Sequence, residues 1–124
     1  MAAQTGAACI LTIDACVCKD AERLCRAIHV TDSGIQTYWG MSELRQSTLG
    51  IPVIAIAVPT AIRAADLSVK ADINPDCFFT TTNILDTINV ASFVIACAIT
   101  QVIYPELDYE DCKRWIEFSL HGIV

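Results

Sequence analysis

Asp14 is the residue on which an enzymatic function of this sequence most depends. It ends an apolar run, Cys9–Ile13, that is typical of a strand buried on both faces. A carboxylate placed there is partly desolvated, so we expect its charged form to be disfavoured unless a donor or a cation compensates. Such an environment suits general acid–base catalysis or metal binding. The structural alternative is that Asp14 caps a following helix through the amides of residues 15–17.

Two more polar residues follow predicted strands. Asp32 follows Ile28–Thr31, and Thr60 lies just past Ile51–Val58, whose continuous apolar sequence predicts a central strand of a mainly parallel sheet. In such a sheet, ligands bind at the carboxyl ends of the strands. We therefore expect Asp14, Asp32 and Thr60 to lie along one functional edge.

The hydrophobic pattern predicts strands that alternate with helices, as in an α/β fold with right-handed crossovers. Pro52 is expected at the first residue of the central strand and Pro59 just beyond its end, where the missing amide donor is tolerated. The expected strands are Ala8–Ile13, Ile28–Thr31, Ile51–Val58 and Cys77–Thr80. The expected helices are Lys19–Ile28, a turn within Met41–Gln46, Ala61–Asp66 capped by Thr60, a long helix from Thr82 or Asn83 to about Tyr104, and Asp108–Leu120.

The composition predicts a single domain, residues 1–124, that buries apolar area against a partner, a sister copy or a missing part of itself. Hydrophobic residues make up 54% of the 124 residues, and charged residues only 18%. The formal net charge is −6, and the only basic cluster is the pair Lys113 and Arg114. Direct nucleic-acid binding is therefore not expected, whereas a cationic protein or peptide substrate is compatible with the charge.

The seven cysteines indicate reduced, buried thiols in a reducing compartment, because their count is odd and they lie within apolar runs. Cys16, Cys18 and Cys25 could be three ligands of a metal site. A structural zinc site, however, usually uses two closely spaced pairs, and neither His29 nor His121 has such a spacing. We expect no metal and no cofactor.

The sequence predicts neither a secretory signal nor a membrane span. Residues 1–8 carry no positive region before their apolar stretch. The uncharged segment Thr87–Pro105 approaches the length of a membrane span. It contains several polar residues and lacks flanking Lys or Arg, so we expect a buried or interface helix.

Asp32, Ser33 and Gly34 match the Asp-Ser/Thr-Gly fingerprint of pepsin-like and retroviral aspartic proteases. Those enzymes are all-β and carry a later apolar-apolar-Gly segment that is not found here. We expect instead a turn with Gly34 at positive φ. No Gly-rich phosphate loop and no nucleophile elbow accompanies this motif.

Three segments together resemble one family. They are Ile13–Ala15 after an apolar strand, His29–Ile35 (HVTDSGI), and Thr48–Thr60 (TLGIPVIAIAVPT). In order and approximate spacing they look like the bacterial spore germination protease, and the similarity covers most of residues 8–104. A related sporulation family of unassigned activity shares the signature Ile13–Cys16, but it lacks the stretch Leu49–Pro52.

The resemblance implies a three-layer α/β/α domain akin to the hydrogenase-maturation proteases (phosphorylase/hydrolase-like), of which this chain is the C-terminal part. It implies an aspartic-type endopeptidase, in the cytoplasm of the spore core, that hydrolyses small acid-soluble spore proteins during germination. The family has two essential aspartates, and Asp14 matches the second. The first belongs to a segment upstream of Ala8–Ile13, before this sequence begins. We therefore expect a homo-oligomer or association with a missing N-terminal segment.

The resemblance also implies substrate-binding or supporting roles for Asp32, Ser33, Gly34, Pro59 and Thr60. Two other functions remain open. One is a catalytically inactive α/β module of a sporulation protein, whose apolar surface around Ile84–Ile103 packs on a partner or a second copy. The other is metal-dependent hydrolysis through Asp14 and His29, by analogy with the maturation proteases.

Overall fold

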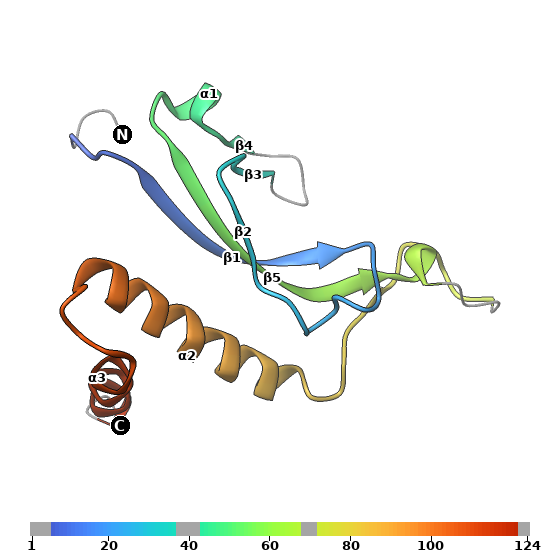
Figure 1. Cartoon of the computed structure of the whole chain (residues 1–124). Helices are drawn as coiled ribbons and strands as arrows, with labels where there is room; N and C mark the ends of the chain where they lie inside the picture. The colour runs from blue at the N-terminus through green and yellow to red at the C-terminus, as the bar shows by residue number, and fades with distance from the viewer. Residues whose placement is uncertain (1–5, 37–42, 68–71, 122–124) are drawn as a thin grey trace. The chain divides into compact units, whose positions relative to one another are not determined.

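The computed structural model describes residues 6–36, 43–67 and 72–121. The chain divides into two compact units, Met1–Ile84 and Leu85–Val124. In its described part, the first unit holds a small mixed sheet, and the second holds two helices (Figure 1). This is a mixed α/β architecture, as the sequence predicts.

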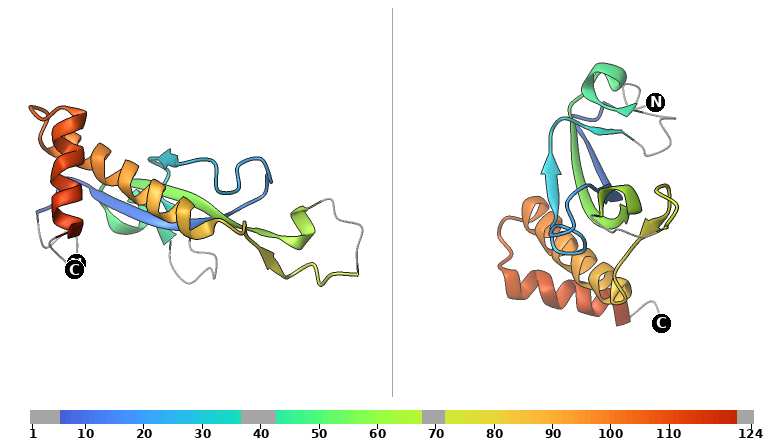
Figure 2. Two further views of the ribbon diagram at one scale, coloured as in Figure 1. Left: turned by 90° about the horizontal axis from the view of Figure 1, so that it is seen from below. Right: turned by 90° about the vertical axis from the view of Figure 1, so that its right-hand side faces the viewer.

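The first unit is organised around one long strand, β5 (Val53–Arg63). It pairs with β1 (Ile10–Cys18), with β2 (His29–Thr31) and, near its end, with β6 (Phe78–Phe79). Figure 2 shows the extended, twisted pair of β1 and β5 from two further sides. The prediction that this apolar segment forms the central strand is confirmed. Its most buried members are Val53, Ala55, Val58, Pro59 and Ile62.

The sheet is only partly parallel. β1 and β5 run parallel, whereas β2 and β6 are both antiparallel to β5. The prediction of a mainly parallel sheet is therefore wrong for the described strands. β2 follows a compact turn rather than a helical crossover, and only a crossover returns the chain to run parallel to its preceding strand.

The segment between β1 and β2 forms turns, and the helix predicted over Lys19–Ile28 is absent. Its backbone bonds are short-range, such as the bond from the Arg23 amide to the Asp20 carbonyl at 3.1 Å. Cys25 adopts a left-handed conformation with φ of 57°. Its amide donates to the carbonyl of Pro59 at 2.7 Å, so this segment is held by the sheet. A left-handed residue ends a right-handed helix, whatever the hydrophobic period suggests.

The central strand continues past the end that the sequence predicts. Pro59 lies within β5, opposite Cys16 of β1, and the pairing then skips Thr60. Such a bulge leaves one residue out of the ladder, which is one of the few settings where a proline is tolerated inside a sheet. The helix predicted over Ala61–Asp66 is wrong, because the strand runs to Arg63. Only a 3-10 turn, Ala64–Asp66, follows it.

Several short elements complete the first unit. β3 (Ile35–Gln36) pairs with β4 (Glu43–Leu44), and α1 (Gln46–Leu49) follows. Of the helical turn predicted within Met41–Gln46, residues 41–42 lie outside the described residues, and residues 43–44 form β4 instead. The short strand predicted over Cys77–Thr80 is confirmed as β6.

Both predicted C-terminal helices are present. α2 spans Ile84–Ile103 and α3 spans Tyr109–His121. α3 begins after Asp108, whose carboxylate accepts the amide of Asp111 at 2.8 Å and so satisfies one free donor of the first turn. Figure 1 shows the two helices crossing rather than running side by side.

α2 is apolar on nearly every side. Ala91, Ile95 and Cys97 are buried, whereas Leu85, Val94 and Val102 are exposed. By length and composition alone this helix, within the described residues, is long and apolar enough to cross a bilayer, as core helices of soluble proteins also are. The interpretation of this segment as an interface helix stays a prediction.

Candidate functional site

Asp14 lies in the middle of β1, in one row with a histidine of β2. Asp14 is in register with Ala57 of β5, and Ala57 is in register with His29. Residues in register on neighbouring strands point to the same face of a sheet, so Asp14 and His29 flank the small side chain of Ala57 on one face. Two strand spacings separate their backbones by about 10 Å, which leaves room for a peptide group or a water between them.

The carboxylate of Asp14 is exposed, so the predicted desolvation at a buried strand end is wrong. The strand continues for four residues beyond it, to Cys18, and no helix follows for it to cap. Its Oδ1 accepts the amide of the next residue, Ala15, at 2.8 Å. The group therefore sits in solvent with one local donor, and it can accept a proton or approach a substrate without burial.

A cavity of about 410 Å³ opens beside this row. His29 and Cys16 both line it, and Cys16 lies two residues after Asp14 on the same strand and face. Pro59, in register with Cys16, forms part of its wall. The full lining is Cys16, Val17, Cys18, Lys19, Asp20, Arg23, His29 and Pro59.

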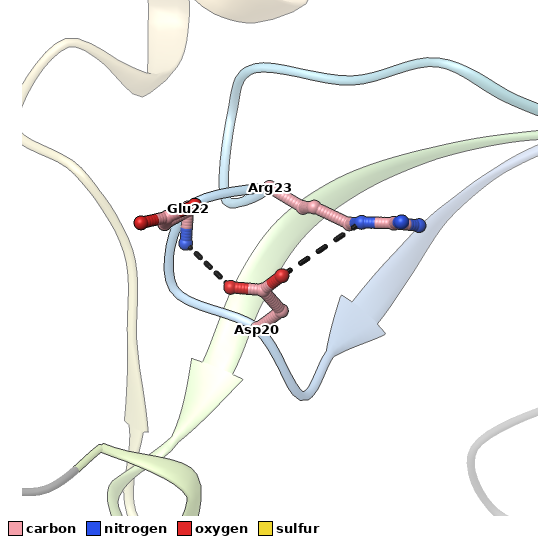
Figure 3. Close-up of polar contacts among 3 residues, drawn as sticks. All are labelled: Asp20, Glu22 and Arg23. Atoms are coloured by element: carbon pink, nitrogen blue, oxygen red, sulfur yellow. Dashed lines mark hydrogen bonds and ion pairs between the residues drawn. The ribbon is translucent and has the colours of Figure 1, made fainter.

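The charged side of the cavity comes from the turn after β1. The Asp20 carboxylate accepts the amide of Glu22 at 2.9 Å and forms an ion pair with Arg23 at 3.8 Å (Figure 3). This pair is largely exposed, so it contributes little to stability and serves mainly to orient the turn. Lys19 adds a second cation to the lining.

The environment of Cys16 does not favour a nucleophilic role for its thiol. Burial raises the pKa of its thiol, and the negative charges of Cys18 and Asp14 raise it further. Reactive cysteines need the opposite shift, which nearby cations or a helix N-terminus provide. The same effect shows that Asp14 is close enough to influence the thiol electrostatically.

Two buried polar atoms lie on the Asp14 face of the sheet. His29 Nε2 and Thr12 Oγ1 are both enclosed, and neither has a hydrogen-bond partner. Thr12 precedes Asp14 by two residues and therefore points to the same side. Unpaired buried polar atoms are costly, so each of the two calls for a partner such as an ordered water or a ligand.

The Asp32–Gly34 motif follows β2. The Ser33 amide donates to Thr31 Oγ1 at 3.1 Å, and Gly34 has φ of 83°, which confirms the predicted turn. Because β2 is antiparallel to β5, its end points away from the ends of β1 and β5. Asp32 and Thr60 thus lie beyond the Asp14 row in opposite directions, and the predicted single functional edge is wrong.

Pro59 and Thr60 have distinct positions. Pro59 lines the cavity, whereas the carbonyl of Thr60, at the bulge, accepts the hydroxyl of Thr80 at 2.6 Å. Thr60 therefore helps to hold the segment after β6 against the central strand. The substrate-binding roles of these residues, and of Asp32, Ser33 and Gly34, stay predictions.

All seven cysteines are free thiols. Cys18, Cys97 and Cys112 are buried, but Cys9 and Cys77 are exposed, so the expectation of uniformly buried thiols is wrong. Within the described ranges, no group of three His, Cys, Asp or Glu side chains is arranged to hold a metal ion.

The sequence did not point to the cavity residues Lys19, Asp20 and Arg23, because they were placed on a helix. It linked His29 with Asp14 only by analogy, in the hypothesis of metal-dependent hydrolysis, and not as neighbours in one sheet. Their row depends on strand pairing, which the spacing along one chain does not encode. The one sequence signal that the two residues lie near each other was that both are next to apolar segments predicted to form strands.

Comparison with known protein families identifies the chain as a member of a peptidase family. Residues 2–74 match the model of a peptidase family. That family is described as Germination protease, and the chain belongs to it. The resemblance carried by the three sequence segments is thereby confirmed.

Individual relatives agree with this assignment. A germination protease of Bacillus cytotoxicus is 41% identical over 63 residues, which is 48% of this chain and 17% of the relative. One from Clostridium tetani is 43% identical over 63 residues, 48% of this chain and 20% of the relative. One from Bacillus mycoides is 40% identical over the same length. The chain thus spans about a fifth of the length of the curated relatives it matches.

Proposed function

We propose that this chain acts as part of a germination-protease-like endopeptidase that hydrolyses small acid-soluble spore proteins in the cytoplasm of the spore core. The family membership of residues 2–74 supports the class of reaction. The location of the proposed active site is supported by the row of Asp14, Ala57 and His29. This row lies beside a cavity that can take a peptide side chain. For the complete domain we propose the three-layer α/β/α fold of the hydrogenase-maturation proteases.

Asp14 is the proposed catalytic carboxylate. Amide hydrolysis by carboxylates needs two groups in different protonation states, because one takes a proton from water while the other donates a proton to the amide. Asp14 alone supplies one of these groups, so a second acid has to come from another segment or another chain. His29 stands across Ala57 from Asp14 and is proposed to orient the water or the peptide.

Asp32, Ser33, Gly34, Pro59 and Thr60 are proposed to bind substrate or support the site. Pro59 forms part of the cavity wall and is almost completely buried, which favours the supporting role over direct contact with substrate. Asp32 lies about three strand residues beyond His29, roughly 10 Å along β2, which is within reach of an extended peptide that crosses the sheet. Asp32→Asn is expected to raise KM more than it lowers kcat.

The test measures the rate at which a purified small acid-soluble spore protein is cleaved. Gel electrophoresis and mass spectrometry detect the products. Asp14→Asn should lower the rate by a factor of about 100 or more, which is typical for loss of a general acid or base. Asp72→Asn, which removes another exposed carboxylate, is the matched control and should cleave normally. If Asp14→Asn keeps more than a few per cent of the activity, Asp14 is not catalytic.

A second candidate function is supported by a different observation. One face of the sheet is apolar and open: Leu11, Ile13, Val30 and Ile54 are 44%, 55%, 68% and 39% exposed. We call this surface the apolar face. A large exposed apolar patch is typical of an interaction site, so the chain could be a catalytically inactive α/β module. That function predicts a stable complex by light scattering and no hydrolysis, even at high protein concentration.

A further inference from the structure

Two exposed aromatic rings contact each other in the second unit, where α2 turns into α3. The centroids of the Tyr104 and Trp115 rings are 5.9 Å apart, and the ring planes are tilted by 49°. Tyr104 directly follows α2, whereas Trp115 lies in the second turn of α3. The two residues are 43% and 57% exposed, so much of both rings remains open to solvent. Tyr and Trp are enriched at interaction sites, because they combine a large apolar surface with a polar edge.

Backbone hydrogen bonds fix the turn between the two helices (Figure 1). The Tyr104 amide donates to the Thr100 carbonyl at 2.8 Å, which continues the last turn of α2. The Leu107 amide donates to the Tyr104 carbonyl at 3.0 Å. The Cys112 amide donates to the Asp108 carbonyl at 3.1 Å, which closes the first turn of α3. A preorganised surface loses little conformational entropy on binding, so this turn is suited to present side chains to a partner.

The side of α3 that carries Trp115 also carries two carboxylates. Asp111 precedes Trp115 by four residues, or one helical turn, so the two side chains are neighbours on one face. Asp108, which caps the first turn, lies about one further turn back. Lys113 and Arg114 lie about 160° and about 100° around the helix from Trp115. Neither carboxylate forms an ion pair within the described part of the chain.

The sequence around this turn attracts cations. Residues 71–112 contain no Lys or Arg, and residues 104–111 (YPELDYED) carry four carboxylates. An aromatic ring attracts a cation to its face through its quadrupole, and a carboxylate attracts a cation through its charge. Arginine suits both groups best, because its planar guanidinium stacks on rings and binds a carboxylate through two parallel hydrogen bonds.

We propose that Tyr104, Trp115 and Asp111 form a docking site for an arginine side chain in an extended segment of a partner protein, with Asp108 at its rim. The guanidinium stacks on the exposed aromatic surface and donates hydrogen bonds to the Asp111 carboxylate. Residues 2–74 match the peptidase family, so the site lies outside the matched part of the chain. It is independent of Asp14 and of the proposed function.

The binding test uses the full chain and a dye-labelled peptide of five Arg-Ala repeats, followed by fluorescence anisotropy. Matched peptides replace every Arg by Lys or by Gln. The arginine peptide should bind saturably, the lysine peptide several-fold more weakly, and the glutamine peptide at least tenfold more weakly. Raising the salt concentration from about 20 to about 200 mM should weaken the arginine peptide, because salt screens exposed charges. An arginine peptide that binds no more tightly than the glutamine peptide overturns the proposal.

Charge substitutions on α3 locate the binding site. Asp111→Asn removes the carboxylate beside Trp115 and should weaken the arginine peptide by a factor of about five. Glu117→Gln is the matched control, since it removes an exposed charge of α3 that lies about 160° around the helix from Trp115. This control should bind within a factor of about two of the parent. An equal loss in both variants would show that overall charge attracts the peptide, and the proposal would be wrong.

Two further variants test the aromatic ring. Trp115→Leu keeps an apolar side chain without a ring face, and it should weaken the arginine peptide by a factor of about five. Because this change also removes the contact with Tyr104, Trp39→Phe supplies a readout that leaves the site intact. In Trp39→Phe, Trp115 is the only tryptophan, and the arginine peptide should change its emission saturably. Saturable binding that leaves this emission unchanged places the peptide elsewhere and overturns the proposal.

A second copy of the chain is the competing occupant of the same aromatic surface. Sedimentation of the parent and of Trp115→Leu at increasing concentration distinguishes the two, and the docking site predicts the same behaviour for both. A parent that dimerises while Trp115→Leu stays monomeric contradicts the proposal, since the rings are then buried between copies. Asp14→Asn should bind the arginine peptide as the parent does, so the docking site and the protease function can fail separately.

Discussion

Asp14 of β1 and His29 of β2 are both in register with Ala57 of β5, so the two side chains occupy one row on one face of the sheet. Cys16 follows on the same face and lines the adjacent cavity. This arrangement makes the thiol of Cys16 a reporter for the charge of Asp14.

Alkylation of Cys16 should become faster in Asp14→Asn. The charge of Asp14 helps to raise the pKa of the Cys16 thiol, so its removal lowers that pKa and increases the thiolate fraction at a given pH. The pH profile of iodoacetamide labelling, read by mass spectrometry, should move to lower pH. Cys9, which is exposed, provides an internal reference, and Asp72→Asn should leave the profile of Cys16 unchanged.

The free energy of unfolding should decrease at alkaline pH. Burial raises the pKa of Cys97, and the neighbouring charges of Cys112 and Glu117 add to this, whereas Lys113 opposes it. A raised folded-state pKa stabilises the protein fully below the unfolded-state value, about 8.5, and the contribution is lost as pH rises toward the folded-state value.

Urea unfolding followed by circular dichroism between pH 7 and 10 measures this loss. Cys97→Ala should reduce the slope above pH 8.5, and Cys9→Ala should not. A slope that is the same in both variants would show that Cys97 does not carry the effect.

Gly34→Ala should destabilise the first unit by about 1 kcal/mol. Gly34 has φ of 83°, where a Cβ atom is strained. Gly34→Asn should cost less, because asparagine tolerates this conformation better than alanine. Thermal unfolding of the three proteins provides the comparison, and equal melting temperatures for Gly34→Ala and the parent would contradict the turn geometry.

Thr80→Val should cost about 1 kcal/mol, because the Thr60 carbonyl at the bulge loses the hydroxyl that donates to it at 2.6 Å. Hydrogen exchange of the β5–β6 amides should become faster in this variant. Thr82→Val, two residues further along and also exposed, is the control. Equal exchange in both variants would argue against a role for this bond.

Asp108→Ala should destabilise α3 by about 1 kcal/mol, since the Asp111 amide loses its partner at 2.8 Å. Asp108→Asn keeps a side-chain acceptor and should retain most of the stability. The helical circular dichroism signal during urea unfolding measures both. An alanine variant as stable as the asparagine variant would exclude capping by this side chain.

The sequence predicted the elements with long, unambiguous patterns. The apolar run within β5, the helices α2 and α3, and the turn at Gly34 were all identified from composition and local chemistry. Prediction from the sequence failed where a local pattern competes with tertiary contacts. Residues 19–28 have a helical period, but the bond from the Cys25 amide to Pro59 holds them as turns. Pro59 suggested a strand end, yet the bulge at Thr60 accommodates it.

By itself the sequence determined the family and the presence of a central apolar strand, because these depend on residue types and order along the chain. Only the tertiary structure decided which residues accompany Asp14. Strand pairing brings His29 into its row from fifteen positions along the chain, and it turns Asp32 and Thr60 away in opposite directions. Register is set by backbone hydrogen bonds between distant segments, so no local pattern could reveal these neighbours.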